Sequence, residues 1–159
     1  MPAMSRNGPA RLPARDGPYR VERLAARPWA LVWDPDGFVE ATILAYLIFA
    51  AWQDAAPSTI RSDARWLASA ATWLGTRSRW AEQSLDGWTV FLQDVALDRL
   101  CVGQRPFRAA CHAAHALHRA YAYWHWADPG TFPRQPFPAT PAERQHWVAL
   151  ILGDLVPSE

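Results

Sequence analysis

The chain has 159 residues, half of them hydrophobic and 13% aromatic, with ten Trp and 14 Pro. This length allows one compact domain with tails, and the hydrophobic content excludes a disordered chain. Sixteen Arg, with no Lys, stand against 15 acidic residues, and the net charge of +1 excludes a uniformly basic coat for nucleic acid. Residues 1–30 nevertheless carry +4, whereas residues 31–159 carry −3. Any nucleic-acid binding therefore depends on the local placement of charge.

The cysteines and the apolar runs bear on the compartment of the protein. Cys101 and Cys111 form no CxxC motif and lie too close together in sequence to suggest the disulfide framework of a secreted domain. No apolar run reaches the roughly 18 residues that span a bilayer, and the amino-terminal sequence lacks the apolar segment of a signal peptide. We therefore expect a soluble, cytoplasmic protein with reduced thiols and no contact with a membrane.

The first third of the chain contains an arm, a turn and a helix. Residues 1–18 combine frequent Pro and Gly with Arg, which predicts a flexible basic arm. Residues 19–33 mix extended-looking and apolar side chains, and Asp34-Pro35-Asp36-Gly37 predicts a turn. From Phe38 to about Trp52 there is no Gly or Pro, and apolar side chains occur on nearly every face. This pattern predicts a helix buried in the centre of a bundle.

Two further helices follow. Pro57-Ser58-Thr59 predicts the start of the second helix, because either hydroxyl can accept a hydrogen bond from an unpaired backbone N–H there. This helix runs to about Leu74, with an apolar stripe on one face and Arg61 and Arg65 on another. A third helix is predicted over residues 86–100, with its apolar side chains toward the core.

The fourth predicted helix, from about Arg105 to Ala127, has a basic face opposite an apolar one. At 100° per residue, a sector of about 80° holds Arg105, Arg108, His112, His115 and Arg119. Alanines flank this sector, and their short side chains would let a bulky backbone approach closely: Ala109, Ala113, Ala116 and Ala120. The alternative is a solvated helix face beside an Ala-lined contact with another helix.

The end of the chain predicts a linker and a last helix. Residues 130–139 are rich in Pro, and Thr140-Pro141-Ala142-Glu143 has the pattern of a capping box with Pro at the first helical position. The helix that follows, within residues 140–159, is expected to end at about Leu155. The sequence as a whole predicts an all-α, four- to five-helix bundle with a helical core over residues 19–129 and almost no strand. Exchange of the last helix between two copies would be a simple route to a homodimer.

Common catalytic motifs are absent from the sequence. There is no Gly-rich phosphate loop, GxSxG elbow or HExxH motif, and a chain without Lys excludes Schiff-base chemistry. The nearest approach to a metal site is Cys111 with His115, four residues apart, and His118, but no second pair of ligands at metal spacing accompanies them. We therefore expect a protein that is not an enzyme and holds no metal or cofactor.

The Trp residues have two interpretations. Trp66 and Trp73 lie seven residues apart on one face of the second helix, where they could stack on bases or pack in the core. Core packing is the favoured interpretation. Trp29 and Trp33, four residues apart before the first helix, are expected to pin the amino-terminal segment to the bundle.

Two segments resemble a known family. Pro57-Ser58-Thr59-Ile60-Arg61, followed by Trp66-Leu67 and Ala71-Thr72-Trp73-Leu74, resembles the S-x-T-x-x-x-Y/W-x-x-x-L-x-x-F-x-x-W-L helix in the core-binding domain of tyrosine recombinases, or phage integrases. The segment from Arg108 to Trp126 is similar to the final helix of that domain, in which an R-x-A-L-R-x-F-Y-x-W pattern precedes Asn-Pro. Here Asp128-Pro129 follows instead. The resemblance covers about residues 38–129.

The resemblance implies a small SAM-like helical domain that clamps one face of double-stranded DNA. Carried over to this chain, the phosphate-contacting positions of the second helix are Thr59, Arg61 and Arg65, and the DNA-facing positions of the fourth are Arg105, Arg108, His112 and Arg119. Only 30 residues follow Pro129, with no Lys and no His-x-x-Arg, so we expect DNA binding without cleavage. The alternative function is a helical protein–protein interaction module, including a homodimer through the last helix, which the charge of −3 over residues 31–159 favours.

Overall fold

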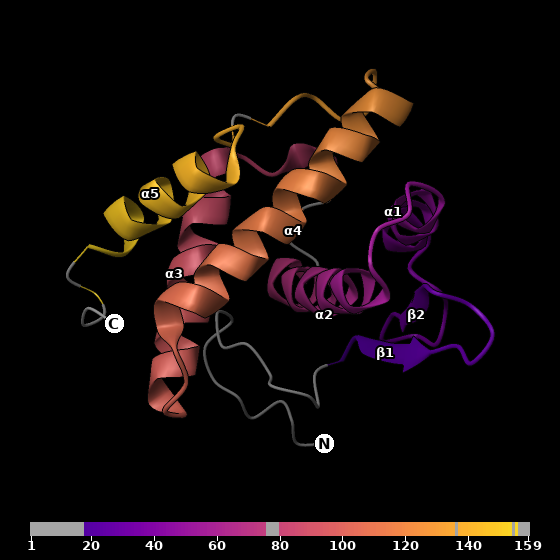
Figure 1. The fold of residues 1–159 in the computed structure, drawn as a ribbon, viewed down its shortest axis with the longest axis horizontal. Coiled ribbons are helices and arrows are strands. Elements are labelled where there is room, and N and C mark those ends of the chain that lie inside the picture. Colours follow the sequence, from indigo (N-terminus) through magenta and orange to yellow (C-terminus); the bar gives the residue numbers. More distant parts are fainter. Residues whose placement is uncertain (1–17, 76–79, 136, 154, 156–159) are drawn as a thin grey trace.

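The computed structural model describes residues 18–75, 80–135, 137–153 and 155. All but the last residue of the predicted arm, residues 1–18, therefore lies outside the described part. The described residues form a mainly helical fold with one small two-stranded sheet (Figure 1). In chain order the elements are β1 (Arg20–Arg23), β2 (Ala30–Trp33), α1 (Ala41–Trp52), α2 (Pro57–Leu74), the 3₁₀ turn η2 (Trp80–Glu82), α3 (Leu85–Cys101), α4 (Pro106–Ala127) and α5 (Pro141–Leu152).

The helix α4 lies at the centre of the fold. It packs against α1, α2, α3 and α5, and in Figure 1 it crosses the molecule with α3 and α5 on one side and α1 and α2 on the other. Small side chains allow this close approach of helices on several sides. The buried alanines of α4 are Ala109, Ala110, Ala113, Ala114, Ala116 and Ala120. The interpretation of the flanking alanines as a contact with other helices is therefore confirmed.

The helix α1 differs from the prediction of a helix buried on every side. It begins at Ala41, because Val39 forms a bridge with Trp33 of β2 and Glu40 caps the helix by accepting a hydrogen bond from the backbone N–H of Thr42. It buries one face, through Ile43, Tyr46, Leu47 and Ala50. The prediction was wrong because α1, in contact with α2, α4 and β2, buries only these residues fully, and its other apolar side chains are half-buried or exposed.

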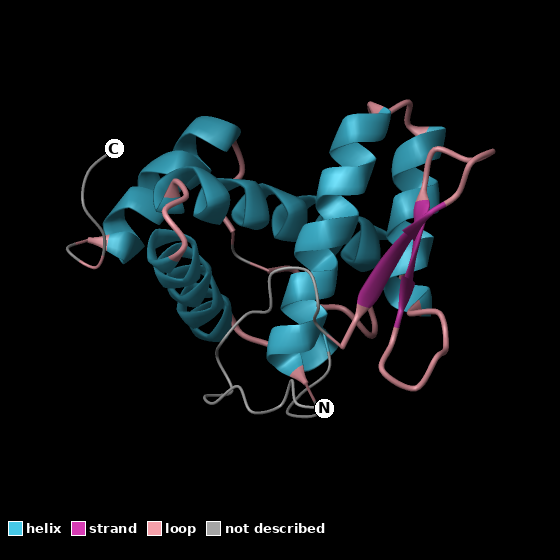
Figure 2. Cartoon of the chain, turned by 90° about the horizontal axis from the view of Figure 1, so that it is seen from below, coloured by secondary structure: helices cyan, strands magenta, loops and turns pink. Residues whose placement is uncertain are grey.

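The described part of the chain contains little strand, as expected, but residues 20–33 form a hairpin that was not predicted. There β1 and β2 pair antiparallel, in a register that places Arg20 opposite Trp33, at the end of the molecule away from α5 (Figure 2). In β2 only Ala30 and Val32 are buried, and four residues are too few for this alternation to stand out in the sequence. Trp29 packs against the core as expected. The predicted turn at Asp34–Gly37 is confirmed, since Asp34 Oδ1 accepts hydrogen bonds from two backbone N–H groups of the turn.

The bounds of the remaining helices agree with the predictions to within a few residues. Helix α2 begins at Pro57, as predicted, but its cap residue is Ala56. The predicted capping by a side-chain hydroxyl is therefore wrong. Helix α5 ends at Leu152, earlier than the expected Leu155. The capping box at its start is confirmed, because Thr140 Oγ1 accepts from the backbone N–H of Glu143 and the Glu143 side chain accepts from that of Thr140.

Aromatic rings fill the core below α4. Trp88 is fully buried, and its ring lies 5.9 Å from those of Trp73 and Trp80. The favoured interpretation of Trp73 as a core residue is confirmed, and Trp66 is half-buried and packs against the edge of the core. The Pro-rich segment contributes to this core too, since Phe137 is buried against Tyr121. No helix in the described part of the chain is both long and apolar enough to cross a bilayer.

Candidate functional site

A cleft of about 990 Å³ opens between α2, the amino-terminal half of α4, the turn between α3 and α4, and β1. Helix α2 contributes one face from Ser62 to Thr72, and β1 with the residue before it contributes Val21 and Tyr19. We call this cavity the basic cleft, because its lining includes the basic residues Arg65, Arg99, Arg105, Arg108 and His112. Among the described residues that line it there is no Asp or Glu. Four of the sixteen Arg thus lie around one cleft.

The two helices present these side chains because of which residues they bury. In α2 the buried stripe includes Ile60, Ala64 and Leu67, so Arg65 lies on the opposite, exposed side and faces the basic cleft. In α4 the buried alanines turn Arg108 and His112, one turn apart, to the same exposed face. The apolar packing of the bundle therefore dictates the direction of the basic groups.

Arg105 reaches the basic cleft from the turn between α3 and α4, and Arg99 reaches it from the last turn of α3. Arg105 is the cap residue of α4 and has an extended backbone, so it lies just before the helix rather than within it. The turn reverses the chain at Gly103, where φ is +75°, a conformation that glycine adopts without strain. Gln104 N–H donates to the carbonyl of Arg99, which closes the turn.

Sequence reasoning missed Arg99, which lies beside Trp66 in the basic cleft. The Arg99 guanidinium lies 5.2 Å from the centre of the Trp66 ring and 3.9 Å from a carboxylate oxygen of Asp98. A signal for Arg99 was present, since it lies in the last turn of a helix directly before a Gly turn that leads into a basic helix. The pairing of Arg99 with Trp66 joins α3 to α2 across the base of this cleft.

Of the seven predicted DNA-contacting residues, four line the basic cleft and three do not. Arg65, Arg105, Arg108 and His112 are brought together there. Arg61 is half-buried one turn before Arg65 on α2, and Thr59 is half-buried in the first turn of that helix; neither is among the cleft residues. The seventh, Arg119, lies farther along α4 in a different environment.

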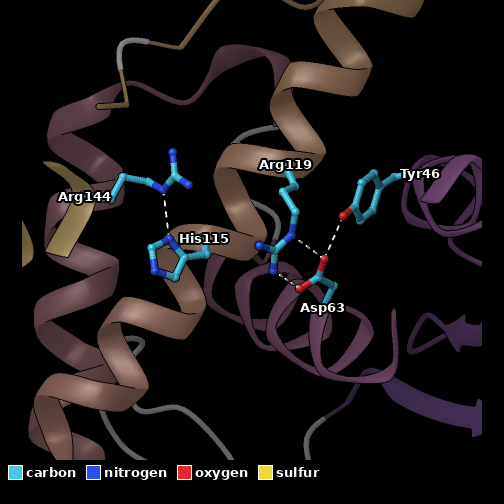
Figure 3. Close-up of polar contacts among 5 residues, drawn as sticks. All are labelled: Tyr46, Asp63, His115, Arg119 and Arg144. Atoms are coloured by element: carbon cyan, nitrogen blue, oxygen red, sulfur yellow. Dashed lines mark hydrogen bonds and ion pairs between the residues drawn. The ribbon is translucent and has the colours of Figure 1, made fainter. Parts of the chain in front are cut away.

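Arg119 is engaged by a buried acid. Its guanidinium donates from Nε and Nη2 to the two carboxylate oxygens of Asp63 on α2, at 3.0 and 2.6 Å (Figure 3). The hydroxyl of Tyr46 on α1 donates to the same carboxylate at 2.7 Å, and burial together with this carboxylate raises the pKa of the Tyr46 hydroxyl. Asp63 is 1% exposed, so a buried charge here needs both partners. This network joins three helices.

An acid on the apolar face of a helix was the missed signal for this network. Asp63 lies between Ile60 and Leu67 in the stripe that packs into the core. A carboxylate in that position must find a cation or several donors when the helix packs. The Arg119 side chain is 41% exposed, so its outer part still reaches solvent while its charge is balanced by Asp63.

The middle of α4 is also covered by α5. Arg144 of α5 is 4% exposed and donates to His115 Nδ1 at 2.9 Å, as Figure 3 shows, and to the carbonyls of Pro138 and Ala139. Burial and the positive charges of Arg144 and Arg119 lower the pKa of His115 to about 4, and the same causes lower the pKa of His118 to about 4. Both rings are therefore neutral near pH 7. The open basic face of α4 is limited to its first two turns.

The cations of the basic cleft are suited to holding an anion. In the described part of the chain, no three His, Cys, Asp or Glu side chains gather into a group that could hold a metal ion. Cys111, considered as a ligand with His115, is buried, and the Nδ1 atom of His115 accepts from Arg144. No family model, curated protein or solved structure matches this chain.

Proposed function

We propose that this protein binds double-stranded DNA without cleaving it, through phosphate contacts made by the basic cleft. The observation that carries the proposal is the convergence of Arg65, Arg105, Arg108 and His112, from two helices and a turn, on a cleft in which none of the described lining residues is a carboxylate. Guanidinium groups bind phosphate oxygens with charge-assisted, often bidentate hydrogen bonds. In a chain with a net charge of only +1, this concentration of cations favours a polyanionic ligand.

The exposed positions of the basic residues suit contacts to a backbone that runs past the surface. Arg65, Arg105, Arg108 and His112 are all exposed. Contacts of this kind position a protein on a duplex and are independent of sequence, and each displaces counterions from the DNA. The Arg-rich residues 1–18 directly precede Tyr19, which lines this cleft. In this proposal their positive charge attracts the same DNA.

We retain a relation to the core-binding domain of tyrosine recombinases as part of the proposal. The two segments that resemble that domain fall on α2 and α4, and these helices pack directly on each other. Their shared cleft supports the assignment of α2 and α4 as the DNA-facing pair. Thr59, Arg61 and Arg119 are then less exposed supports of the clamp rather than its main phosphate contacts.

The test is the fluorescence anisotropy of labelled duplex DNA titrated with protein at low and moderate salt. We expect Arg108→Ala to weaken binding equally for unrelated sequences and to reduce the slope of log K against log salt by about 1. Arg134→Ala is the matched control, because Arg134 is exposed, carries the same charge and lies outside the basic cleft. Equal losses in the two variants, or no binding at low salt, would refute the cleft as a DNA site.

A second candidate function is the protein–protein interaction module, and a separate surface favours it. Rings of α1 and the carboxyl-terminal part of α4 gather at the surface: Phe49 lies 4.6 Å from Tyr123 and 5.7 Å from Trp126, and Trp126 is 71% exposed. Exposed aromatic groups are typical of protein interfaces. Helix α5 packs on α4 and α3 of its own chain. Sedimentation velocity over a range of concentrations tests for a homodimer, and a monomer throughout would exclude one.

A further inference from the structure

The basic cleft also has a chemistry that contacts to duplex phosphates do not use. Besides its cations, the cleft is lined by the indole of Trp66 and by hydrogen-bonding side chains of α2 and the turn before α4, namely Ser62, Ser69, Thr72 and Gln104. Phosphates of a duplex that lies across the cleft can reach the exposed arginines. They do not need an aromatic ring. A flat apolar ring next to amide and hydroxyl groups is instead suited to a nucleobase.

Trp66 is placed to serve as a stacking platform. Part of its indole packs against the core and part lines the cleft, whereas Trp73 on the same helix is buried in the core. The Arg99 guanidinium lies 5.2 Å from the centre of its ring, and such an arginine both fixes the indole and offers a second flat surface to a base. Arg65 precedes Trp66 in sequence and also lines the cleft. A phosphate on Arg65 would therefore bring the attached base toward the indole.

The size of the cavity limits what can enter it. Its volume of about 990 Å³ is at the upper end of the range of about 300 to 1,000 Å³ for small-molecule sites. A space of this size admits one or two unpaired nucleotides and excludes a stack of base pairs. Double-stranded DNA can therefore bind at the rim but not inside.

We infer that the basic cleft binds DNA at the junction between a duplex and a single strand, with an unpaired base stacked on Trp66 and the adjoining phosphates on Arg65, Arg105 and Arg108. This inference rests on the proposed function and specifies the form of DNA that it concerns. Unpaired bases at a duplex end are already free to stack on a side chain, whereas extruding a paired base costs a few kcal/mol. Blunt duplex DNA then binds only through its phosphates.

The test compares three labelled probes by anisotropy: a blunt duplex of about two helical turns, the same duplex with a short single-stranded tail, and the tail strand alone. Stacking of one base contributes about 1–3 kcal/mol. We therefore expect the tailed duplex to bind about 5- to 150-fold more tightly than the blunt one. The comparison uses the wild-type protein, so it does not depend on whether a variant folds.

Trp66→Leu identifies the stacking group, because it removes the aromatic ring and retains an apolar side chain. We expect it to abolish the preference for the tailed duplex and to leave the affinity for the blunt duplex within about twofold, while Trp66→Phe retains part of the preference. Trp126→Leu, at an exposed tryptophan outside this cleft, is the matched control and is expected to change neither affinity. Circular dichroism and thermal unfolding establish that each variant is folded.

The outcomes separate the inference from the proposed function. Equal affinity for blunt and tailed duplexes overturns the inference and leaves DNA binding intact. Absence of binding to both duplexes overturns the proposed function. Tighter binding of the free tail strand than of the tailed duplex also overturns the inference, because the site would then be one for single strands. A preference for the tailed duplex that persists in Trp66→Leu and is lost in Trp126→Leu would place the stacking elsewhere and refute the role of Trp66.

Discussion

The buried carboxylate of Asp63 gives a prediction in which the two partners of one ion pair behave differently. Asp63 is 1% exposed, and its three hydrogen bonds come from Tyr46 and Arg119. The Arg119 side chain is 41% exposed. Removing the cation strands a negative charge in the core, whereas removing the anion leaves a guanidinium that can turn to water. We expect Arg119→Met to be more destabilising than Asp63→Asn.

The magnitudes follow from this difference in exposure. Removing one partner of a buried ion pair costs about 3–5 kcal/mol when the remaining charge stays buried. We expect a loss of this size for Arg119→Met, because Tyr46 alone would then face the carboxylate. For Asp63→Asn we expect a smaller loss of about 1–2 kcal/mol, since Arg119 is partly solvated and Tyr46 can still donate to the amide oxygen. The double variant should be more stable than Arg119→Met, because it buries no charge.

Urea unfolding, followed by circular dichroism, measures these free energies. Asp36→Asn and Arg134→Met are the controls, because both residues are exposed, and surface changes of this kind alter stability by about 0.5 kcal/mol or less. A greater loss for Asp63→Asn than for Arg119→Met, or a double variant less stable than both single ones, would refute the reasoning. Folded Arg119→Met should also retain its affinity for duplex DNA, and a loss like that of Arg108→Ala would return Arg119 to the DNA-contacting set.

Three further predictions concern the covering of α4 by α5. Because burial and nearby arginines lower the pKa of His115 and His118 to about 4, the unfolded chain takes up protons first as the pH falls below about 6.5. The free energy of unfolding should therefore fall between pH 6.5 and 4, by about 1 kcal/mol for each of the two partly solvated rings. Urea titrations at several pH values across this range measure the loss. His115→Gln should reduce the loss. Arg144→Met removes three hydrogen bonds and should lower the free energy of unfolding by about 1–2 kcal/mol. Relative to the wild type, amide hydrogen exchange should become faster in α5 and change less in α2. Unchanged exchange in α5 would contradict this role of Arg144. Thr140→Ala removes the capping box and should cost about 1 kcal/mol, whereas Thr131→Ala, in an exposed turn, should have little effect on thermal unfolding.

The sequence predicted the helices because their signals are local. Apolar stripes repeat over four or five turns in α2 and α4, and the capping box of α5 is complete within four residues. The hairpin was not predicted because its sequence signals are short. Strand β2 has two buried side chains, Ala30 and Val32, and it ends after four residues. Periodicity needs more residues than that to distinguish a strand from a loop.

The position of α1 and the partners of Arg119 depend on tertiary contacts that periodicity does not contain. An apolar side chain on every face of residues 38–52 predicted a central helix, yet the alanines of α4 made α4 the element that others can approach from several sides. The basic face of α4 was predicted as one continuous stripe. Its first two turns stay open, and its later part is covered, by Asp63 from α2 and by Arg144 from α5. Helix phase gives the direction of a side chain but not the element that meets it.

The most direct test of the central claim is a nuclear magnetic resonance titration of ¹⁵N-labelled protein with duplex DNA at low salt. Binding in the basic cleft predicts amide shifts concentrated in residues 62–72 of α2 and residues 104–112 around the start of α4. The shifts should diminish as salt rises, because phosphate contacts release counterions. Amide shifts confined to α5, or to the residues around Phe49, Tyr123 and Trp126, would contradict the proposed site if the signals of residues 62–72 and 104–112 did not change.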